Sequence, residues 1–320
     1  MKHSSPDSCN ICDNRKENNY IDVSEKMLQT YEVFRYLECG QCGCLSLLNN
    51  LEDMSRYYPS SYYSFTKKSV SHKKSTIEKL KYMLRISSMK GYLGKGSFLD
   101  SLITKIRPIH FLWLKKVSVS LDSKILDVGC GNGFLLSEMR QYGFHNLYGI
   151  DLFTQNNVKE DGLNISQSDI HRLEESEFDF MMYNHSFEHI ENPHLELKIM
   201  YNKLSDNGTL MIRVPLCDSY AFRHYRENWV QLDAPRHYFL YTRASMQTLA
   251  EQHGFEIVDV LYDSNGFQFA GSECYVLNEP LSKIERLFSS EKLFLWEEKA
   301  KELNQIEDGD QICFYLKKRK

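Results

Sequence analysis

A glycine-rich loop at the end of a short apolar strand most constrains the fold of this 320-residue chain. Residues 125–133 read ILDVGCGNG, so a buried strand pattern runs directly into alternating glycines, and a helical pattern begins at about Phe134. Glycine is needed where a backbone turns sharply and approaches a ligand without a Cβ atom in the way. The sequence therefore predicts a strand–loop–helix unit with a ligand at the carboxyl end of the strand.

The spacing of the glycines and the nearby acids distinguishes a dinucleotide site from a site for a cofactor without phosphate. The dinucleotide fingerprint GxGxxG would require glycine at the position of Phe134. Asp127 precedes the loop and would repel the pyrophosphate that a helix N-terminus binds. Asp151 and Asp169 follow the next two predicted strands, and each alone is typical of a helix cap or a turn. Together, the three acids favour a cofactor that offers an amino group, ribose hydroxyls and an adenine amine but no phosphate.

Strand and helix patterns alternate from Lys124 onward, as in a doubly wound parallel sheet with crossover helices. Seven strands are predicted, at 124–128, 146–150, 163–167, 178–184, 208–214, 255–261 and 312–317. Helices are predicted at 134–142, 194–204 and 242–253, with a helical insertion at about 265–307 before the last strand. This α/β domain covers residues 119–320.

Residues 51–118 are predicted to connect this domain to the N-terminal segment. The connection contains two helices, at 77–89 and 98–117, where apolar residues recur every three or four positions. The tyrosine-rich stretch RYYPSSYYSF at 56–65 is interpreted as a packing surface between a small and a large domain, with an amphipathic ligand site as the alternative.

Two paired-cysteine motifs lie in the first 50 residues, CNIC at Cys9–Cys12 and CGQC at Cys39–Cys42. Each CxxC turn presents two thiolates on one side of a tight loop, and four thiolates make a closed tetrahedral Zn²⁺ site. The sequence therefore predicts a zinc-ribbon-like segment at 1–50 with a structural, noncatalytic zinc ion on Cys9, Cys12, Cys39 and Cys42. Cys44 is an alternative ligand with a less favourable spacing, and unligated cysteines are the other interpretation.

Several motifs together resemble the class I methyltransferases that use S-adenosylmethionine. ILDVGCGNG, YGID at 148–151 and SQSDI at 166–170 resemble the glycine loop, ribose acid and adenine acid of that family. EHIENP at 188–193 and the turn LSDNG at 204–208 resemble its fourth-strand segment and the turn after it. The resemblance implies a Rossmann-like seven-stranded sheet and is close over roughly residues 124–262. The CxxC pairs, RYYPSSYYSF and Pro235-Arg236-His237 resemble a zinc-ribbon subgroup linked to surface-polysaccharide and natural-product sugars.

The resemblance also implies which residues hold S-adenosylmethionine. They lie in the glycine loop and at the ends of the neighbouring strands: Asp127, Gly129, Cys130, Gly131, Gly133, Asp151, Leu152, Asp169, Ile170 and Asn184.

Three histidines are candidates for a general base, because histidine titrates near neutral pH. His185 and His189 follow the fourth strand, and His237 belongs to the Pro-Arg-His element. His185 is favoured, since ligands of open α/β sheets bind at the carboxyl ends of strands. Alternatively, His189 and Glu188 hold the loop and the helix together.

The overall charge narrows the range of acceptors. The chain has 39 basic and 43 acidic side chains, a net charge of −4, which argues against a nucleic acid. The predicted acceptor is a small molecule, with O-methylation of a sugar or a nucleotide-linked sugar favoured. The alternatives are C- or N-methylation of another metabolite, a nucleic-acid methyltransferase and a noncatalytic binding protein with the same fold.

Hydropathy and cysteine spacing predict the cellular compartment. No apolar run approaches the ~18–20 residues that span a bilayer, and the N-terminus has no apolar signal-peptide core. The nine cysteines are not spaced as a disulfide framework, which fits a reducing compartment. A cytoplasmic protein without a membrane span is expected, and the sequence does not indicate its oligomeric state.

Overall fold

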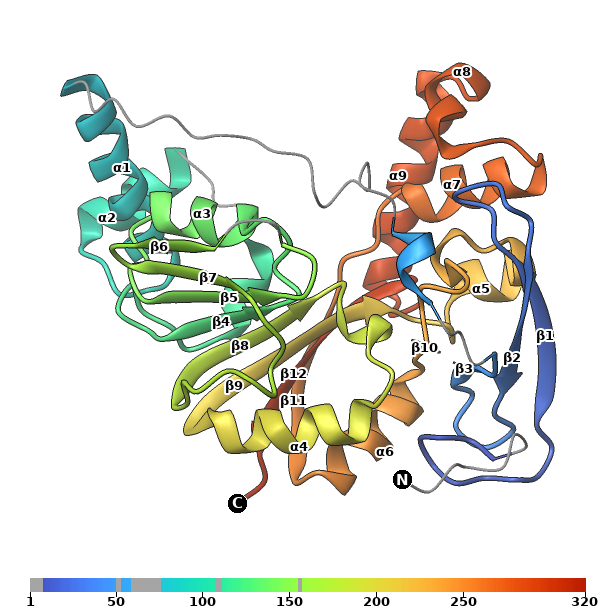
Figure 1. Cartoon of the computed structure of the whole chain (residues 1–320). Coiled ribbons are helices and arrows are strands. Elements are labelled where there is room, and N and C mark those ends of the chain that lie inside the picture. Colours follow the sequence, from blue (N-terminus) through green and yellow to red (C-terminus); the bar gives the residue numbers. More distant parts are fainter. Residues whose placement is uncertain (1–7, 50–52, 59–75, 107–110, 155–156) are drawn as a thin grey trace. The chain divides into compact units, whose positions relative to one another are not determined.

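The computed structural model describes residues 8–49, 53–58, 76–106, 111–154 and 157–320 (Figure 1). The described residues form two compact units. The first unit consists of residues 8–49, 53–58, 185–195 and 213–314, and the second consists of residues 76–106, 111–154, 157–184, 196–212 and 315–320. Of the tyrosine-rich stretch at 56–65, the residues from 59 onward lie outside the described residues.

The strands form two sheets. Their order is β1-β2-β3-β10 in the smaller sheet and β11-β12-β9-β8-β4-β5-β7-β6 in the larger one, in which β9 and β12 contribute residues to both units. The strands are β1 (Asn19–Ser24), β2 (Val33–Glu38), β3 (Leu45–Leu47), β4 (Ile125–Val128), β5 (Leu147–Asp151), β6 (Val158–Glu160), β7 (Leu163–Gln167), β8 (Phe178–Asn184), β9 (Leu204–Pro215), β10 (Phe239–Leu240), β11 (Phe255–Tyr262) and β12 (Gln311–Lys318).

Helices account for much of the remaining described chain. The α-helices are α1 (Thr76–Tyr92), α2 (Phe98–Ile106), α3 (Phe134–Gln141), α4 (Pro193–Lys203), α5 (Tyr220–Tyr225), α6 (Arg243–Gln252), α7 (Phe267–Val276), α8 (Ile284–Leu287) and α9 (Ser290–Gln305). The 3₁₀ helices are η1 (Ser55–Tyr57), η3 (Leu112–Lys116), η4 (Phe187–His189), η5 (Arg226–Asn228), η6 (Val230–Leu232) and η7 (Leu281–Lys283). Within the described residues, no helix is both long and apolar enough to cross a membrane.

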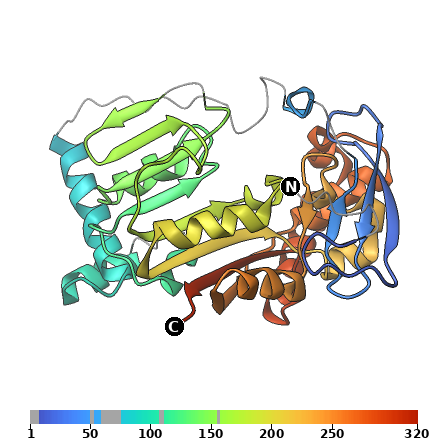
Figure 2. The ribbon, with the colours of Figure 1, turned by 60° about the horizontal axis from the view of Figure 1, so that its bottom comes forward.

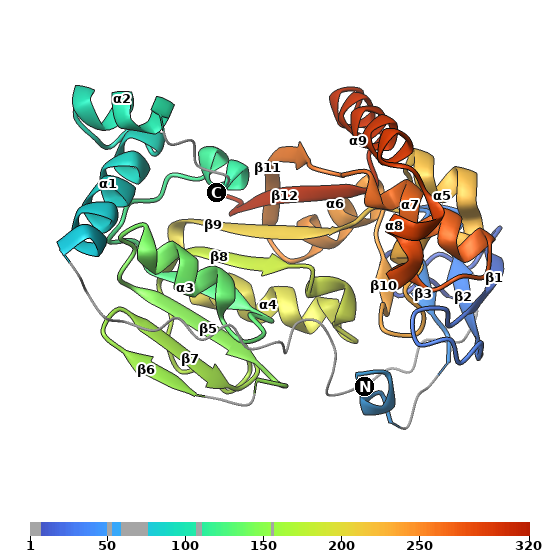
Figure 3. The same cartoon turned by 90° about the horizontal axis from the view of Figure 1, so that it is seen from above.

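The second unit is built on parallel strands. β4, which is buried along its whole length, pairs in parallel with β5 on one side and β8 on the other, and β5 pairs in parallel with β7. Figures 1 and 3 show α3 and α4 on opposite faces of these strands. Because the strands are parallel, their carboxyl ends lie at one edge, where the glycine loop after β4 begins.

The structure corrects two sequence-based predictions. Among the described residues the larger sheet has eight strands, so the prediction of seven is wrong. The additional strand, β6, pairs antiparallel with β7 at the edge of the sheet, and its sequence VKE has no apolar alternation. The helix predicted at 98–117 ends at Ile106. Of the rest of the predicted helix, residues 107–110 lie outside the described residues, and Leu112–Lys116 form the 3₁₀ helix η3.

The first unit contains the smaller sheet. β1 pairs antiparallel with β2, β2 with β3, and β3 with β10 from the second half of the chain. Figure 2 shows these N-terminal strands, in blue, beside orange segments of the same unit. Phe34 and Tyr36 of β2 share a buried apolar cluster with Phe222, Trp229 and Phe269. The N-terminal segment is therefore packed into this unit by its apolar side chains.

Candidate functional site

The glycine loop after β4 is held against the end of β5. The backbone N–H groups of Gly129 and Cys130 donate to the carbonyl of Ile150 at 2.8 and 3.1 Å. The Gly131 N–H donates to Oδ2 of Asp151 at 2.9 Å, and the Phe153 N–H donates to Oδ1 at 2.7 Å. Asp151 thus lies beside the loop with both oxygens oriented, and each oxygen keeps a lone pair for a ligand hydroxyl.

Asp127 is a buried acid with an unused oxygen. Its side chain is 3% exposed, and its Oδ1 has no hydrogen-bond partner among the described residues. Burial, together with the nearby charge of Asp151, raises the pKa of Asp127 to about 7. Leaving a buried carboxylate oxygen without a donor is costly, so the site favours a ligand that brings an N–H group or positive charge. S-adenosylmethionine fits this requirement through its amino group.

Gly133 ends the loop at a position that only glycine occupies without strain. Its φ is +70°, and a Cβ atom there would meet Cδ1 of Ile165 at 2.0 Å. We expect Gly133→Ala to lower the free energy of unfolding by about 2 kcal/mol, from the left-handed backbone and the crowding together. Chemical denaturation measures this change.

Gly94 provides a matched control for Gly133. Its φ is +67°, but nothing lies within 4 Å of its added Cβ, so Gly94→Ala carries only the backbone strain of about 1 kcal/mol. Adding Ile165→Val, which removes the Cδ1 atom, should restore part of the stability of Gly133→Ala. Equal losses for Gly133→Ala and Gly94→Ala would contradict the crowding argument.

The remaining predicted cofactor residues differ in their surroundings. Leu152 is exposed directly after Asp151, whereas Ile170 is buried. Asp169 accepts a hydrogen bond from the Arg172 N–H at 3.0 Å, so it caps a turn, and Asn184 is the last residue of β8.

The Cys130 side chain points back to β5, where a Cβ atom on Gly149 would meet its Sγ at 2.8 Å. Burial raises the pKa of the Cys130 thiol well above its usual value, which excludes it as a nucleophile.

The four cysteines of the two CxxC motifs converge in the first unit. All four Sγ atoms lie within 4.8 Å of one another, with 3.6 Å between Cys9 and Cys42 and 3.5 Å between Cys12 and Cys39. Sulfur atoms placed tetrahedrally about 2.3 Å from one zinc ion are about 3.8 Å apart, so the spacing fits a shared ion. Cys44 is outside this group and donates to the carbonyl of Leu45.

The three candidate histidines surround one buried carboxylate, Glu188, which is 1% exposed. Its Oε1 is 3.5 Å from Nδ1 of His185 and 3.9 Å from Nε2 of His237. The ring of His189 is inclined at 65° to that of His237 in an edge-to-face contact, with centroids 4.8 Å apart. Sequence reasoning assigned Glu188 only to holding the loop, because its distance from His237 along the chain hides their contact.

Burial and charge determine the protonation of this cluster. Burial acts to raise the pKa of Glu188, but the hydrogen bond from His185 and the nearby imidazoles outweigh it and hold that pKa at about 2. Burial, with a contribution from His189, lowers the pKa of His237 to about 4. Near neutral pH, Glu188 is therefore an anion and His237 is a neutral imidazole.

His237 and its neighbour Arg236 are held by hydrogen bonds to residues of the N-terminal segment and to nearby Asp233. The Tyr36 hydroxyl of β2 donates to its backbone carbonyl at 2.8 Å. Its neighbour Arg236 is fully buried, with Nε 2.9 Å from Oδ2 of Asp233 and a terminal nitrogen 3.1 Å from Oε1 of Glu25. The N-terminal sheet thus positions the Pro-Arg-His element.

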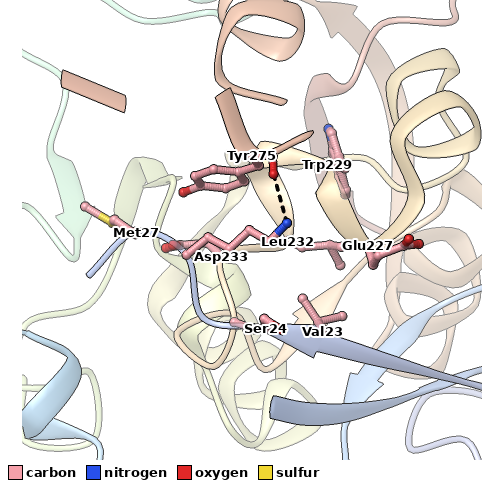
Figure 4. Close-up of a pocket in the computed structure, with 10 residues that line it drawn as sticks. Val23, Ser24, Met27, Glu227, Trp229, Leu232, Asp233 and Tyr275 are labelled. Carbon is pink, nitrogen blue, oxygen red and sulfur yellow. Dashed lines mark hydrogen bonds between the residues drawn. The ribbon is translucent and has the colours of Figure 1, made fainter. Parts of the chain in front are cut away.

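A small cavity lies behind this element, and Figure 4 shows Trp229, Asp233 and Tyr275 among its lining residues. The Lys26 ammonium donates to the Tyr275 carbonyl at 3.0 Å across it. The cavity encloses about 10 Å³, which is room for about one water molecule. It is too small for a methyl acceptor.

A methyltransferase-domain family model matches residues 99–260 of the chain. Among curated proteins, EEF1A lysine methyltransferase 2 of Danio rerio is 31% identical over 172 residues, which cover 50% of this chain and 65% of the relative. Its Homo sapiens counterpart is 46% identical over 39 residues, 12% of this chain and 16% of the relative. The chain thus spans less than two thirds of the length of either relative.

Solved structures of methyltransferases are also similar to this chain. A methyltransferase in complex with the Haloferax volcanii Trm112 methyltransferase activator has a TM-score of 0.46 and 14% identity, covering 76% of this chain and 93% of that chain. An S-adenosylmethionine-dependent methyltransferase from Archaeoglobus fulgidus has a TM-score of 0.39 and 20% identity, covering 66% and 99%.

The curated relatives correct the predicted partner. Both are named for methylation of a lysine of EEF1A, which is a protein. The prediction of a small-molecule acceptor, a sugar or a nucleotide-linked sugar, is therefore wrong. Overall charge and resemblance to a sugar-linked subgroup were insufficient evidence for an acceptor.

Proposed function

The chain belongs to the methyltransferase-domain family and is an S-adenosylmethionine-dependent methyltransferase, and on that premise we propose that its acceptor is an amine nitrogen of a protein, of the lysine type. The observation that carries this proposal is the 172-residue similarity to a lysine methyltransferase. The alignment covers only part of each relative. The proposal therefore names the chemical class of the acceptor and no individual protein.

The residues around the glycine loop are proposed to hold the cofactor. Asp127 would receive its amino group, Asp151 its ribose hydroxyls and Asp169 its adenine amine, with the exposed Leu152 covering the adenine ring. The unpartnered Oδ1 of Asp127 and the oriented carboxylate of Asp151 support this assignment. When bound, S-adenosylmethionine supplies a methyl group on a sulfonium ion.

An amine attacks a methyl group only through an unprotonated lone pair, so a proton must leave it. His185 is the proposed proton acceptor, because its Nδ1 is oriented by Glu188 and its side chain is 29% exposed. Its φ of +56° lies in the left-handed region, which few non-glycine residues adopt. Strained residues of this kind concentrate at functional sites. Asn184, the preceding residue, ends the strand that pairs with β4.

The cysteine cluster is proposed to hold a structural zinc ion. Four sulfur ligands leave no open coordination position, so the ion stabilises the N-terminal sheet and takes no part in methyl transfer. None of the nine cysteines forms a disulfide, which supports the cytoplasm as the expected compartment.

The acceptor class is testable with labelled S-adenosylmethionine. Purified enzyme should transfer the methyl label to protein, EEF1A being the first to try, and acid hydrolysis should release the label as ε-N-methyllysine. Acetylating the lysines of the same protein beforehand removes the nucleophilic lone pairs and should abolish labelling. His185→Ala should lower turnover by at least about 100-fold, the usual contribution of a general base.

Cofactor affinity distinguishes a catalytic defect of His185→Ala from loss of the fold. Affinity of His185→Ala for S-adenosylhomocysteine should stay within about twofold of the original, because the cofactor contacts proposed above exclude that side chain. Label that enters only low-molecular-weight material, or that survives lysine acetylation, would overturn the proposed acceptor.

A further inference from the structure

We propose that Glu188, His189 and His237 bind one divalent first-row metal ion, at a site separate from the four cysteines. A ligand atom of each residue lies within 4.8 Å of those of the other two, and all three residues belong to the first unit. This site goes beyond the proposed function, because methyl transfer to an amine does not require a metal.

The two histidines are oriented as metal ligands usually are. Nδ1 of His189 is 2.8 Å from the carbonyl oxygen of Arg236, and Nδ1 of His237 is 2.8 Å from that of Gln231. A carbonyl only accepts, so each Nδ1 carries a hydrogen, and Nε2 is the ring nitrogen that can offer a lone pair to a metal ion. Metal-binding histidines characteristically donate their second ring nitrogen to a carbonyl or carboxylate in this way. The Tyr58 oxygen, 3.1 Å from Nδ1 of His189, is a second acceptor for the same hydrogen.

Glu188 supplies the negative charge and an unused ligand atom. Its Oε1 faces His185 and His237, whereas its Oε2 is buried without a hydrogen-bond partner among the described residues. A buried carboxylate oxygen in that condition costs free energy unless a cation or donor reaches it. A metal ion bound to this carboxylate would supply that cation.

The ligand set indicates the class of metal. Two imidazole nitrogens with one carboxylate suit Zn²⁺, Fe²⁺, Co²⁺ or Ni²⁺, whereas Mg²⁺ and Ca²⁺ prefer oxygen ligands only. Ligand atoms at about 2.1 Å from one ion lie up to about 4 Å apart, so small side-chain rotations would close the site. Three protein ligands leave at least one position for water or another ligand, unlike the closed cysteine cluster.

The backbone already holds the two ligand-bearing segments together. The Tyr238 N–H donates to the carbonyl of Glu188 at 2.9 Å, and the Leu47 N–H of β3 donates to the carbonyl of Tyr238 at 2.9 Å. The ligands are therefore positioned by main-chain contacts before any ion binds, which lowers the ordering cost of binding. A bound ion would cross-link the loop after β8 to the segment before β10.

Cobalt(II) tests the site in the full-length protein. With the cysteine cluster first loaded with Zn²⁺, equilibrium dialysis against Co²⁺ should find one bound cobalt per chain, with weak d–d absorption and no intense sulfur-to-cobalt band. Glu188→Gln and His237→Gln should each weaken this binding at least tenfold. His224→Gln, which alters an exposed histidine stacked on Tyr220 in the same unit, is the matched control and should bind as the original does.

The outcome is decisive in both directions. Because Glu188 and His237 are buried, circular dichroism checks the fold of their variants, and His189→Gln at its half-buried position provides a third variant. Weaker binding in folded ligand variants, with unchanged binding in His224→Gln, supports the site. The proposal is overturned if the zinc-loaded protein binds no cobalt, or if the ligand variants bind it as tightly as His224→Gln does.

Discussion

Replacing Cys39 by serine should remove one sulfur-coordinated zinc ion per chain and unfold the N-terminal strands. Structural zinc in small domains contributes about 10–16 kcal/mol of apparent binding free energy at neutral pH, comparable with the whole stability of a typical domain. β1, β2 and β3 are short strands of a four-stranded sheet, and they contribute only Val23, Phe34, Tyr36 and Leu45 to the buried apolar cluster, too few to replace that contribution. Amide hydrogen exchange should show loss of protection throughout these strands.

Cys39→Ser should also loosen the histidine cluster around Glu188. Tyr36 of β2 donates to the carbonyl of His237, so disordering β2 removes a contact between residues 201 positions apart. Cys44→Ser is the control, because Cys44 is buried nearby but outside the four-sulfur group, and this variant should keep its zinc. X-ray absorption should detect Zn–S distances of about 2.3 Å in the original protein and in Cys44→Ser only. Freshly purified, reduced protein without such zinc would refute the ribbon.

Replacing Asp127 by asparagine should weaken cofactor binding and stabilise the ligand-free protein. A charged hydrogen bond contributes about 1.5–3 kcal/mol, so affinity for S-adenosylhomocysteine at pH 8 should fall by about 10- to 100-fold. In the original protein, affinity should fall about tenfold per pH unit below pH 7, because binding requires the ionised form of an acid whose pKa is about 7. Asp127→Asn should lack this dependence.

Asp127→Asn should weaken cofactor binding but stabilise the ligand-free protein. Its folded-state pKa, about 7, is above the ordinary value of 3.8, because burial disfavours the charged form. Its stabilising contribution is therefore present below pH 3.8, declines as pH rises and is lost above pH 7. The shift corresponds to about 4 kcal/mol at most. Without ligand at pH 8, Asp127→Asn should thus unfold at higher denaturant than the original protein; equal or lower stability would contradict the burial argument.

Local patterns predicted much of the fold. The apolar run before the glycine loop became β4, and helical periodicity located α3, α4 and α6 within two residues of their observed ends. Elements without a local pattern were not located individually. β10 has only two residues. α7 lies inside the predicted helical insertion, but it is buried around most of its circumference and lacks the polar face that reveals the ends of a helix.

Motif spacing likewise predicted which cysteines would converge, since a CxxC turn brings two sulfurs together wherever the chain goes. It did not reveal that Glu188 lies at the centre of three histidines. That grouping depends on the loop after β8 and the segment before β10 coming together, and no local rule fixes where two distant segments meet.

Short motifs were enough to indicate the methyl donor and the cysteines of the cluster, because each motif spans only a few residues. The continuation of the N-terminal sheet into β10, which positions His237 beside Glu188, became visible only in the folded chain. Strand pairing and core packing join residues across the whole chain, through contacts whose free energy exists only once the first unit has folded.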